Sequence, residues 1–427
     1  MPTPHVPVRS TQRQYNVTLQ LPGQRHVLSR WWCMAGTPSG SPDLVVVGAG
    51  IVGAACAYQA TQVGLSVTVV ERGPIVGGTT GAGEGNILVS DKEPGPELDL
   101  ALLSIGRWQA LADLPLEGGT FGAAVEVENK GGLVVASGQS TLDGLDKLAA
   151  QQRDAGVEAV PVPAGRLHDE EPHLADGLAG GYLYPQDMQV QPMLAAAHLL
   201  RLARRAGATV LPHEPVTGFL RDGERVTGVR TARRAIPAGS VLNAAGTWAG
   251  QLAELAGVRL PVAPRRGFIL VTEPLPAIIR HKVYLADYVA DVASGSAALQ
   301  SSPVVEGTRS GTVLIGATRE RVGFDAAMSL PALRRLAAGA VQLFPVLRDV
   351  AVIRAYRGFR PYCPDHLPVI GPDPRAPGLH HACGHEGAGI GLSLGTARLV
   401  AQVLVGDRPD LDTYPFRPER FAPEGAE

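Results

Sequence analysis

The chain has 427 residues, of which 45% are hydrophobic and 18% charged. This is an ordinary globular composition, long enough for two domains with separate cores. The net charge of -2 gives no electrostatic basis for binding nucleic acid. The four cysteines, Cys33, Cys56, Cys363 and Cys383, form no CxxC pair, which argues against a zinc or iron–sulfur site and favours a reducing, cytoplasmic location.

Residues 1–41 contain four arginines and no acidic residue. Such a composition occurs in transit peptides, but no apolar segment of a secretory signal follows it. We expect a disordered extension, or a start codon assigned too early with translation beginning at Met34.

Residues 43–71 have the pattern of a strand, a glycine turn, a helix and a second strand. An apolar run enters Gly48, Gly50 and Gly53, and the second strand ends in Glu71. In a dinucleotide-binding βαβ unit these glycines allow a tight turn, close approach to a pyrophosphate, and close helix–strand packing. The acid lies at the spacing expected for a ribose hydroxyl acceptor. The three glycines and the polar residues of the helix argue against a transmembrane segment.

The next segments mix helical and strand patterns. A loop rich in glycine, with Thr79 and Thr80, suits close approach to a diphosphate. Apolar spacing predicts helices over 96–113, 141–155 and from Pro192 to about 206, and strands between 121 and 136. Residues 168–175 contain three acids and two histidines, which we interpret as a solvated turn rather than a metal or acid–base cluster.

The second half contains two further places where backbone could approach a cofactor. Residues 240–257 read as a strand, a small-residue turn at 244–246, and a helix. Strands dominate 262–350, including 282–292, and a helix is predicted at 328–344. Residues 379–406 repeat the strand, glycine turn and helix pattern, with Gly387, Gly389 and Gly391 at the helix N-terminus.

Several motifs, in order, resemble those of one enzyme family. They are VVVGAGIVG with Glu71-Arg72, GGTTGAGEGN, the strand at Val216, VLNAAGTWA, GFRPYCPDHLPVIGP and GHEGAGIGLS. Together they span residues 42–410 and resemble the FAD-dependent amine and amino-acid oxidoreductases of the D-amino-acid oxidase superfamily. Within this superfamily, the sequence most resembles the β subunits of hydroxyproline and opine dehydrogenases and of hydrogen cyanide synthase.

The resemblance implies a non-covalent FAD, because neither Cys363 nor Cys383 falls where sarcosine oxidases attach flavin. The implied cofactor-binding residues come from both glycine turns and the segments between them. They are Gly48, Gly50, Ile51, Val52, Gly53, Glu71, Arg72, Thr79, Thr80, Glu84, Gly85, Asn86, Val216, Gly246, His385, Gly387, Ala388, Gly389, Ile390 and Gly391.

The resemblance also implies a substrate and a reaction. Arg360 in the G-x-R-P stretch should bind a substrate carboxylate, as a guanidinium fork does well. Hydride transfer from the amine-bearing carbon to the flavin gives an imine that water hydrolyses, with His385 and Tyr288 as weak acid–base candidates. Gly387 stands where glycine-oxidase-like sequences can have a second arginine, which leaves room for a larger amino acid. The GTVLIGAT strand lacks the lysine of sarcosine oxidases, which favours a dehydrogenase.

We therefore predict an α/β fold, in which a Rossmann-like FAD-binding domain is interleaved with a strand-rich α+β substrate domain. The FAD-binding domain takes residues 42–118, 186–258 and 356–412, and the substrate domain 119–185 and 259–355. Electrons should pass to a quinone, another flavin subunit or oxygen, so a hetero-oligomer with a redox subunit, peripheral to the membrane if it reduces quinone, is one expectation. A 2-hydroxy acid dehydrogenase and a non-catalytic flavin-bearing subunit are the alternatives.

Overall fold

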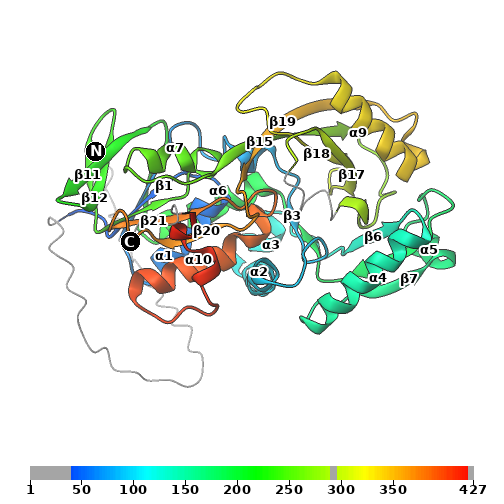
Figure 1. Ribbon diagram of the computed structural model, residues 1–427, viewed down its shortest axis with the longest axis horizontal. Coiled ribbons are helices and arrows are strands. Elements are labelled where there is room, and N and C mark those ends of the chain that lie inside the picture. The colour runs from blue at the N-terminus through cyan, green and yellow to red at the C-terminus, as the bar shows by residue number, and fades with distance from the viewer. Residues whose placement is uncertain (1–39, 289–295, 422–427) are drawn as a thin grey trace, which may run out of the picture. The chain divides into compact units, whose positions relative to one another are not determined.

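The computed structural model describes residues 40–288 and 296–421 (Figure 1). The expectations for residues 1–39, including Cys33 and Met34, lie outside this part of the chain. The described residues form two large sheets, a three-stranded sheet and two short two-stranded sheets. This mixed architecture confirms the predicted fold class.

The first large sheet is built around β1 (Leu44–Val47), whose four residues are all buried. Its strand order is β10-β2-β1-β14-β21-β20, and all neighbours are parallel except the edge strand β20. Continuous apolar runs are typical of parallel strands covered on both faces. The other strands are β2 (Val67–Val70), β10 (Thr209–Leu211), β14 (Ser240–Asn243), β20 (Val369–Pro372) and β21 (Leu379–Cys383).

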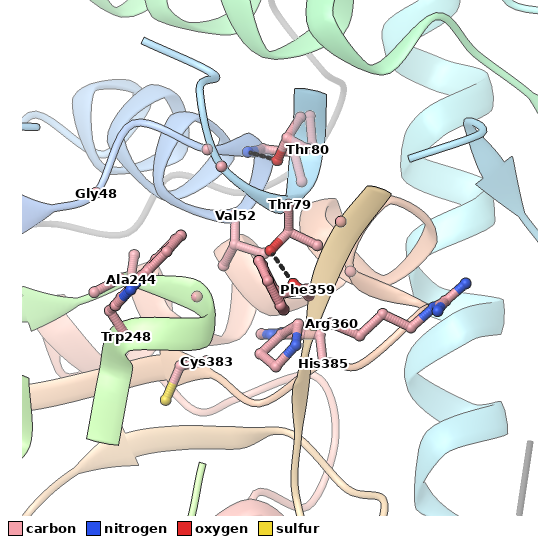
Figure 2. A pocket seen from close by; sticks show the side chains of 18 of the residues that line it. Gly48, Val52, Thr79, Thr80, Ala244, Trp248, Phe359, Arg360, Cys383 and His385 are labelled. Carbon is pink, nitrogen blue, oxygen red and sulfur yellow. Dashed lines mark hydrogen bonds between the residues drawn. The ribbon is translucent and has the colours of Figure 1, made fainter. Parts of the chain in front are cut away.

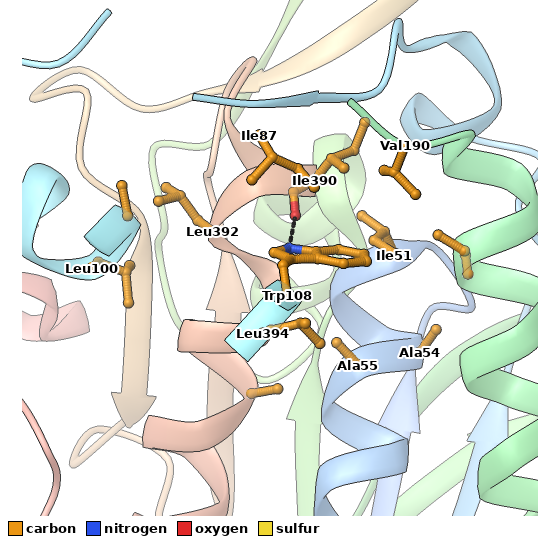
Figure 3. Close-up of a cluster of buried hydrophobic side chains, with 14 of the residues drawn as sticks. Ile51, Ala54, Ala55, Ile87, Leu100, Trp108, Val190, Ile390, Leu392 and Leu394 are labelled. Carbon is orange, nitrogen blue, oxygen red and sulfur yellow. Dashed lines mark hydrogen bonds between the residues drawn. The ribbon is translucent and has the colours of Figure 1, made fainter. Parts of the chain in front are cut away.

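Helices pack on this sheet around a core of small and large side chains. Helix α1 (Ile51–Gln62) contacts α6 (Pro192–Arg205) and α10 (Gly389–Val405), and α10 contacts α2 (Pro96–Ala112). Alanines of α1 allow this close packing. Figure 3 shows fully buried Trp108 of α2 between α1 and α10, where its indole N–H donates to the Ile390 carbonyl at 3.3 Å. The N-terminus of α10 is thereby fixed against α2.

The second large sheet has the order β19-β15-β18-β17-β16-β6-β8-β7. Helix α9 (Leu330–Leu343) packs on β15, β17 and β18, and α4 (Gln139–Asp154) on β6 and β8. The strands are β6 (Gly132–Ala136), β7 (Val160–Pro163), β8 (Gly180–Tyr184), β15 (Ala263–Thr272), β16 (Lys282–Leu285), β17 (Gln300–Gly307), β18 (Val313–Arg319) and β19 (Val352–Tyr362).

The remaining elements connect these layers. The three-stranded sheet is β11 (Val216–Asp222), β12 (Arg225–Thr231) and β13 (Ala235–Pro237), and the two short pairs are β3 (Asn86–Ile87) with β9 (Met188–Gln189) and β4 (Pro115–Leu116) with β5 (Gly119–Thr120). Short helices are α3 (Phe121–Ala124), α5 (Leu167–Glu170), α7 (Ala249–Glu254) and the 3-10 turns η1 (Thr79–Ala82), η2 (Ala164–Arg166), η3 (Gly246–Trp248), η4 (Pro345–Leu347), η5 (Tyr414–Phe416) and η6 (Pro418–Phe421). No helix among the described residues is long and apolar enough to cross a membrane.

Two strand predictions were wrong in part. Residues 121–136 begin as helix α3, because the Thr120 hydroxyl caps its first turn by accepting from the Ala123 amide at 3.2 Å; only 132–136 form a strand. The strand predicted at 282–292 ends at Leu285, and residues 289–295 lie outside the described residues. The predicted long helices correspond to α2, α4, α6 and α9.

The two large sheets draw their strands from different parts of the chain. Strands of the six-stranded sheet fall within 42–118, 186–258 and 356–412, while the eight-stranded sheet takes its strands from 132–184 and 263–362. Strand β19 crosses position 356 without interruption. The exact domain boundaries stay a prediction.

Candidate functional site

A cavity of about 520 Å³ connects the two sheets. It begins at the carboxyl ends of the parallel strands, where Val47, Val70 and Cys383 line it, and reaches β15 and β19. In open parallel sheets, ligands bind outside the carboxyl ends of the strands. The cavity is therefore in the place expected for a nucleotide, with its far end on a second sheet.

The first glycine turn lets three backbone segments meet. Gly48 has a φ of +113°, and a Cβ on it would lie 2.4 Å from the carbonyl oxygen of Ala244. A Cβ on Gly53 would lie 2.0 Å from the Gly48 carbonyl oxygen. Only glycine fits at such distances. Gly48 thus brings β1 against the turn after β14, and Gly53 brings α1 against β1.

The Glu71 carboxylate is held in place at the end of β2. One oxygen accepts from the Ala49 amide and the other from the Gly73 amide, both at 2.9 Å. A carboxylate has about four lone-pair sites, so each oxygen retains capacity for a further donor. The side chain lines the cavity and can accept from a ribose hydroxyl.

Trp248 forms a wall of the cavity that the sequence interpretation missed. The Arg72 guanidinium carbon lies 3.5 Å from the centroid of the Trp248 ring, and both residues line the cavity. Such stacking is an attractive cation–π contact. The turn at 244–246 was predicted to approach the cofactor, but nothing in its spacing indicated that the following tryptophan would face the Glu71-Arg72 pair.

The threonine-rich loop is joined to β19. The Thr79 hydroxyl donates to the Phe359 carbonyl at 2.6 Å, as Figure 2 shows. Thr247 donates to the same oxygen at 2.7 Å. Thr80 joins the same loop to the start of α1, because its hydroxyl accepts from the Ile51 amide at 3.0 Å. The loop is therefore fixed between the first glycine turn and the strand that carries Arg360.

Arg360 extends from β19 over the face of the eight-stranded sheet. Its Nη1 donates to the Thr318 carbonyl at 2.8 Å, and a Cβ on Gly267 would lie 2.1 Å from that nitrogen. Figure 2 shows the side chain running past His385 and away from the turn at Gly48. Burial, and then the positive charge of Arg319, lower the pKa of the Arg360 guanidinium, which stays charged at neutral pH because its intrinsic pKa is so high.

His385 and Tyr288 both line the cavity. His385 is only 4% exposed, and its Nε2 lies 2.9 Å from the Thr396 hydroxyl of α10. Burial lowers the pKa of His385 to about 3, so the ring is neutral at physiological pH. This arrangement favours a positioning role for His385 over proton transfer. Tyr288 packs against Tyr284, with ring centroids 4.9 Å apart.

Most residues singled out in the sequence are brought together at this cavity. The exceptions are Gly53, Ala388 and Gly391, which do not line it. Gly53 serves helix–strand packing, Ala388 is the N-cap of α10, and a Cβ on Gly391 would lie 3.3 Å from the Cα of Ile87. The predicted residues that line it are Gly48, Gly50, Ile51, Val52, Glu71, Arg72, Thr79, Thr80, Glu84, Gly85, Asn86, Val216, Gly246, Tyr288, Arg360, His385, Gly387, Gly389 and Ile390.

The described cysteines and acid–histidine groups offer no second reactive centre. Cys56, Cys363 and Cys383 are buried free thiols, and burial raises the pKa of Cys383 to about 12. A thiol that stays protonated is a weak nucleophile. Within residues 40–288 and 296–421, no three His, Cys, Asp or Glu side chains are placed to hold a metal ion; His168 of the 168–175 segment is exposed and contacts Asp176.

The cavity combines a helix N-terminus, a carboxylate fixed by two backbone amides and a buried guanidinium, an arrangement that suits a dinucleotide-dependent oxidoreductase. Residues 43–403 match the protein family described as DAO, FAD dependent oxidoreductase. The chain belongs to this family, and its cofactor is FAD. The glycine cradle at Gly48 and the Glu71 carboxylate fit such a dinucleotide.

Three relatives illustrate the likeness. The chain is 30% identical over 423 residues to hydrogen cyanide synthase subunit HcnC of Pseudomonas aeruginosa, covering 90% of this chain and 97% of HcnC. It is 31% identical to glycine oxidase of the same organism, covering 88% and 99%. The crystal structure of glycine oxidase from Geobacillus kaustophilus superposes with a TM-score of 0.79 at 26% identity, covering 89% of this chain and 98% of that chain.

Proposed function

We propose that the chain oxidises an amino acid or a secondary amine at the carbon that bears the nitrogen, giving an imine that water hydrolyses to an oxo acid. The observation that carries this proposal is the position of Arg360, whose guanidinium lies on the wall of the same cavity that both glycine turns line. FAD, when bound, supplies the hydride acceptor. The names of relatives such as glycine oxidase support the same substrate class.

In this proposal, the side chains at the site bind and orient the substrate and do not exchange protons with it. Arg360 can hold a carboxylate through nitrogens not used by the Thr318 carbonyl. His385 is neutral and bonded to Thr396, so it fixes the start of α10 beside the reaction site. The positive end of that helix favours negative charge nearby.

We further propose a dehydrogenase with non-covalent FAD that passes electrons to a partner redox subunit. No lysine occurs in β18, and the described cysteines are buried, protonated thiols. HcnC, itself named as a subunit, supports a hetero-oligomer. Release of yellow flavin on acid precipitation tests the non-covalent attachment, and the rate of reoxidation by air against that by a soluble quinone tests the acceptor.

The decisive experiment is an anaerobic screen of amino acids, secondary amines and 2-hydroxy acids for bleaching of the bound flavin. We expect amines to bleach the flavin. In Arg360→Ala, which should retain FAD, the rate of bleaching should fall at least tenfold. Arg354→Ala is the matched control, because Arg354 is an exposed arginine of the same strand. Bleaching by hydroxy acids alone would assign a 2-hydroxy acid dehydrogenase, and no bleaching by any compound would indicate a non-catalytic subunit.

A further inference from the structure

A second arginine lies beside Arg360, and none of the described carboxylates forms an ion pair with it. Arg319, the last residue of β18, is 5% exposed, and its guanidinium carbon lies 4.7 Å from the centroid of the Tyr288 ring. Among the described residues, no carboxylate oxygen lies within 4.0 Å of the guanidinium of Arg319 or of Arg360. Buried charges are ordinarily paired, so these two cations stand out.

The sheet register places both guanidinium groups on one face. The backbones of Arg266 and Glu320 form an antiparallel β-bridge. The residue before Glu320, Arg319, therefore lies opposite the residue after Arg266, Gly267. On the other side of β15, Gly267 pairs with Gly358 of β19, and side chains two residues apart on a strand share a face. Arg360 therefore projects on the face of Gly358 and Gly267, and its guanidinium occupies the space left by the missing side chain of Gly267.

Two neighbouring arginines have carboxylate partners, unlike Arg319 and Arg360. Arg265 contacts Glu386 at 3.3 Å, and Arg266 contacts Glu320 at 2.8 Å. Tyr288, whose ring contacts the Arg319 guanidinium, lines the cavity together with Arg360. Arg319 itself is not among the residues that line the cavity. The Glu84 carboxylate acts on Arg360 from beyond ion-pair distance, but neither guanidinium has a carboxylate partner within 4.0 Å among the described residues.

We propose that Arg319 is a second anion-binding residue, and that the substrate carries two carboxylates: an acidic amino acid, or a secondary amine with a carboxylate on each arm. This inference rests on the proposed function for the identity of the reacting carbon. A single carboxylate on Arg360 would leave the Arg319 charge buried and unpaired, whereas a dicarboxylate neutralises both. Arg319 also supplies a second cation near Arg360, where Gly387 offers none although a Cβ on Gly387 would lie 3.5 Å from Arg360 Nε.

The test is a binding measurement on the FAD-loaded protein with unreactive acids, so that it does not depend on turnover. Matched pairs, butyrate with succinate and valerate with glutarate, are titrated while the flavin absorption spectrum or the heat of binding is followed. We expect at least tenfold tighter binding of each diacid. Arg319→Gln should reduce this preference to near unity while leaving monoacid binding unchanged, Arg360→Gln should weaken both acids, and Arg354→Gln should change neither.

Flavin bleaching by sarcosine and iminodiacetate, a second matched pair, separates the two proposals. If diacids bind no more tightly than monoacids, or if none of the acids binds, the role of Arg319 is refuted even when amines still bleach the flavin. If Arg319→Gln weakens both acids equally, the two arginines share one carboxylate and the dicarboxylate inference is wrong. If diacids bind with the expected preference but no amine bleaches the flavin, the proposed function fails and the binding role of Arg319 stands.

Discussion

The Thr79 hydroxyl donates to the Phe359 carbonyl at 2.6 Å, and so joins the threonine-rich loop to the residue that precedes Arg360. The two residues are 280 positions apart in the chain. Thr247 donates to the same oxygen at 2.7 Å. The loop that carries Thr79 and the strand that carries Arg360 are therefore held together by one carbonyl with two hydroxyl donors.

This doubled contact predicts a non-additive effect. A neutral hydrogen bond contributes about 1 kcal/mol net, and in Thr79→Val or Thr247→Val alone the remaining hydroxyl still serves the carbonyl. We expect each single variant to weaken FAD binding less than about threefold, and the double variant to weaken it by more than the product of the two. Titration of apoprotein with FAD measures this. Additive losses would show that the two hydroxyls act independently.

Gly267→Ala should displace Arg360. A Cβ at this position would lie 2.1 Å from Arg360 Nη1 and 2.5 Å from the Thr318 carbonyl oxygen, so the guanidinium must move. We expect at least a tenfold rise in KM with unchanged FAD affinity. Gly218→Ala is the control, because nothing lies within 4 Å of a Cβ there. Unaltered steady-state kinetics in Gly267→Ala would contradict the assigned position of Arg360.

Buried His385 should make stability depend on pH in a defined window. Its folded pKa, about 3, is below the ordinary value of 6.5, so the unfolded chain binds the extra proton between these values. Stability should therefore be fully present above about pH 6.5 and fall as the pH drops toward 3. His385→Gln should flatten the slope of unfolding free energy against pH, measured by urea denaturation, whereas exposed His168→Gln should not. An unchanged slope in His385→Gln would refute the assignment.

The stack of Arg72 on Trp248 should contribute to cofactor binding. A cation–π contact is worth about 0.5–2 kcal/mol, so Trp248→Leu should weaken FAD binding by roughly 2- to 30-fold, measured as the FAD dissociation constant. The control is Tyr414→Leu, which removes an exposed aromatic ring that Arg417 covers at 3.4 Å. Equal FAD affinity in Trp248→Leu and the parent would show that the wall is structural only.

Local patterns predicted the elements well where one physical signal dominated. The glycine spacing from Gly48 to Gly53 and the apolar period of α2 and α6 each reflect contacts within one short segment. The strand predicted from Phe121 failed because a single capping hydroxyl, that of Thr120, outweighed the β-forming residues. Trp248 and Arg319 were missed for another reason: their roles depend on β-sheet register and on loops far apart in the sequence, which no local spacing records.

The geometry of Glu71 sets a limit on which nucleotides this protein can accept. Both carboxylate oxygens are already held by backbone amides, so the side chain cannot rotate out of the way of an incoming ligand. A ribose bearing an extra phosphate would bring like charge against a fixed anion. We therefore expect the backbone around this one acid to discriminate against phosphorylated dinucleotides without help from a further side chain.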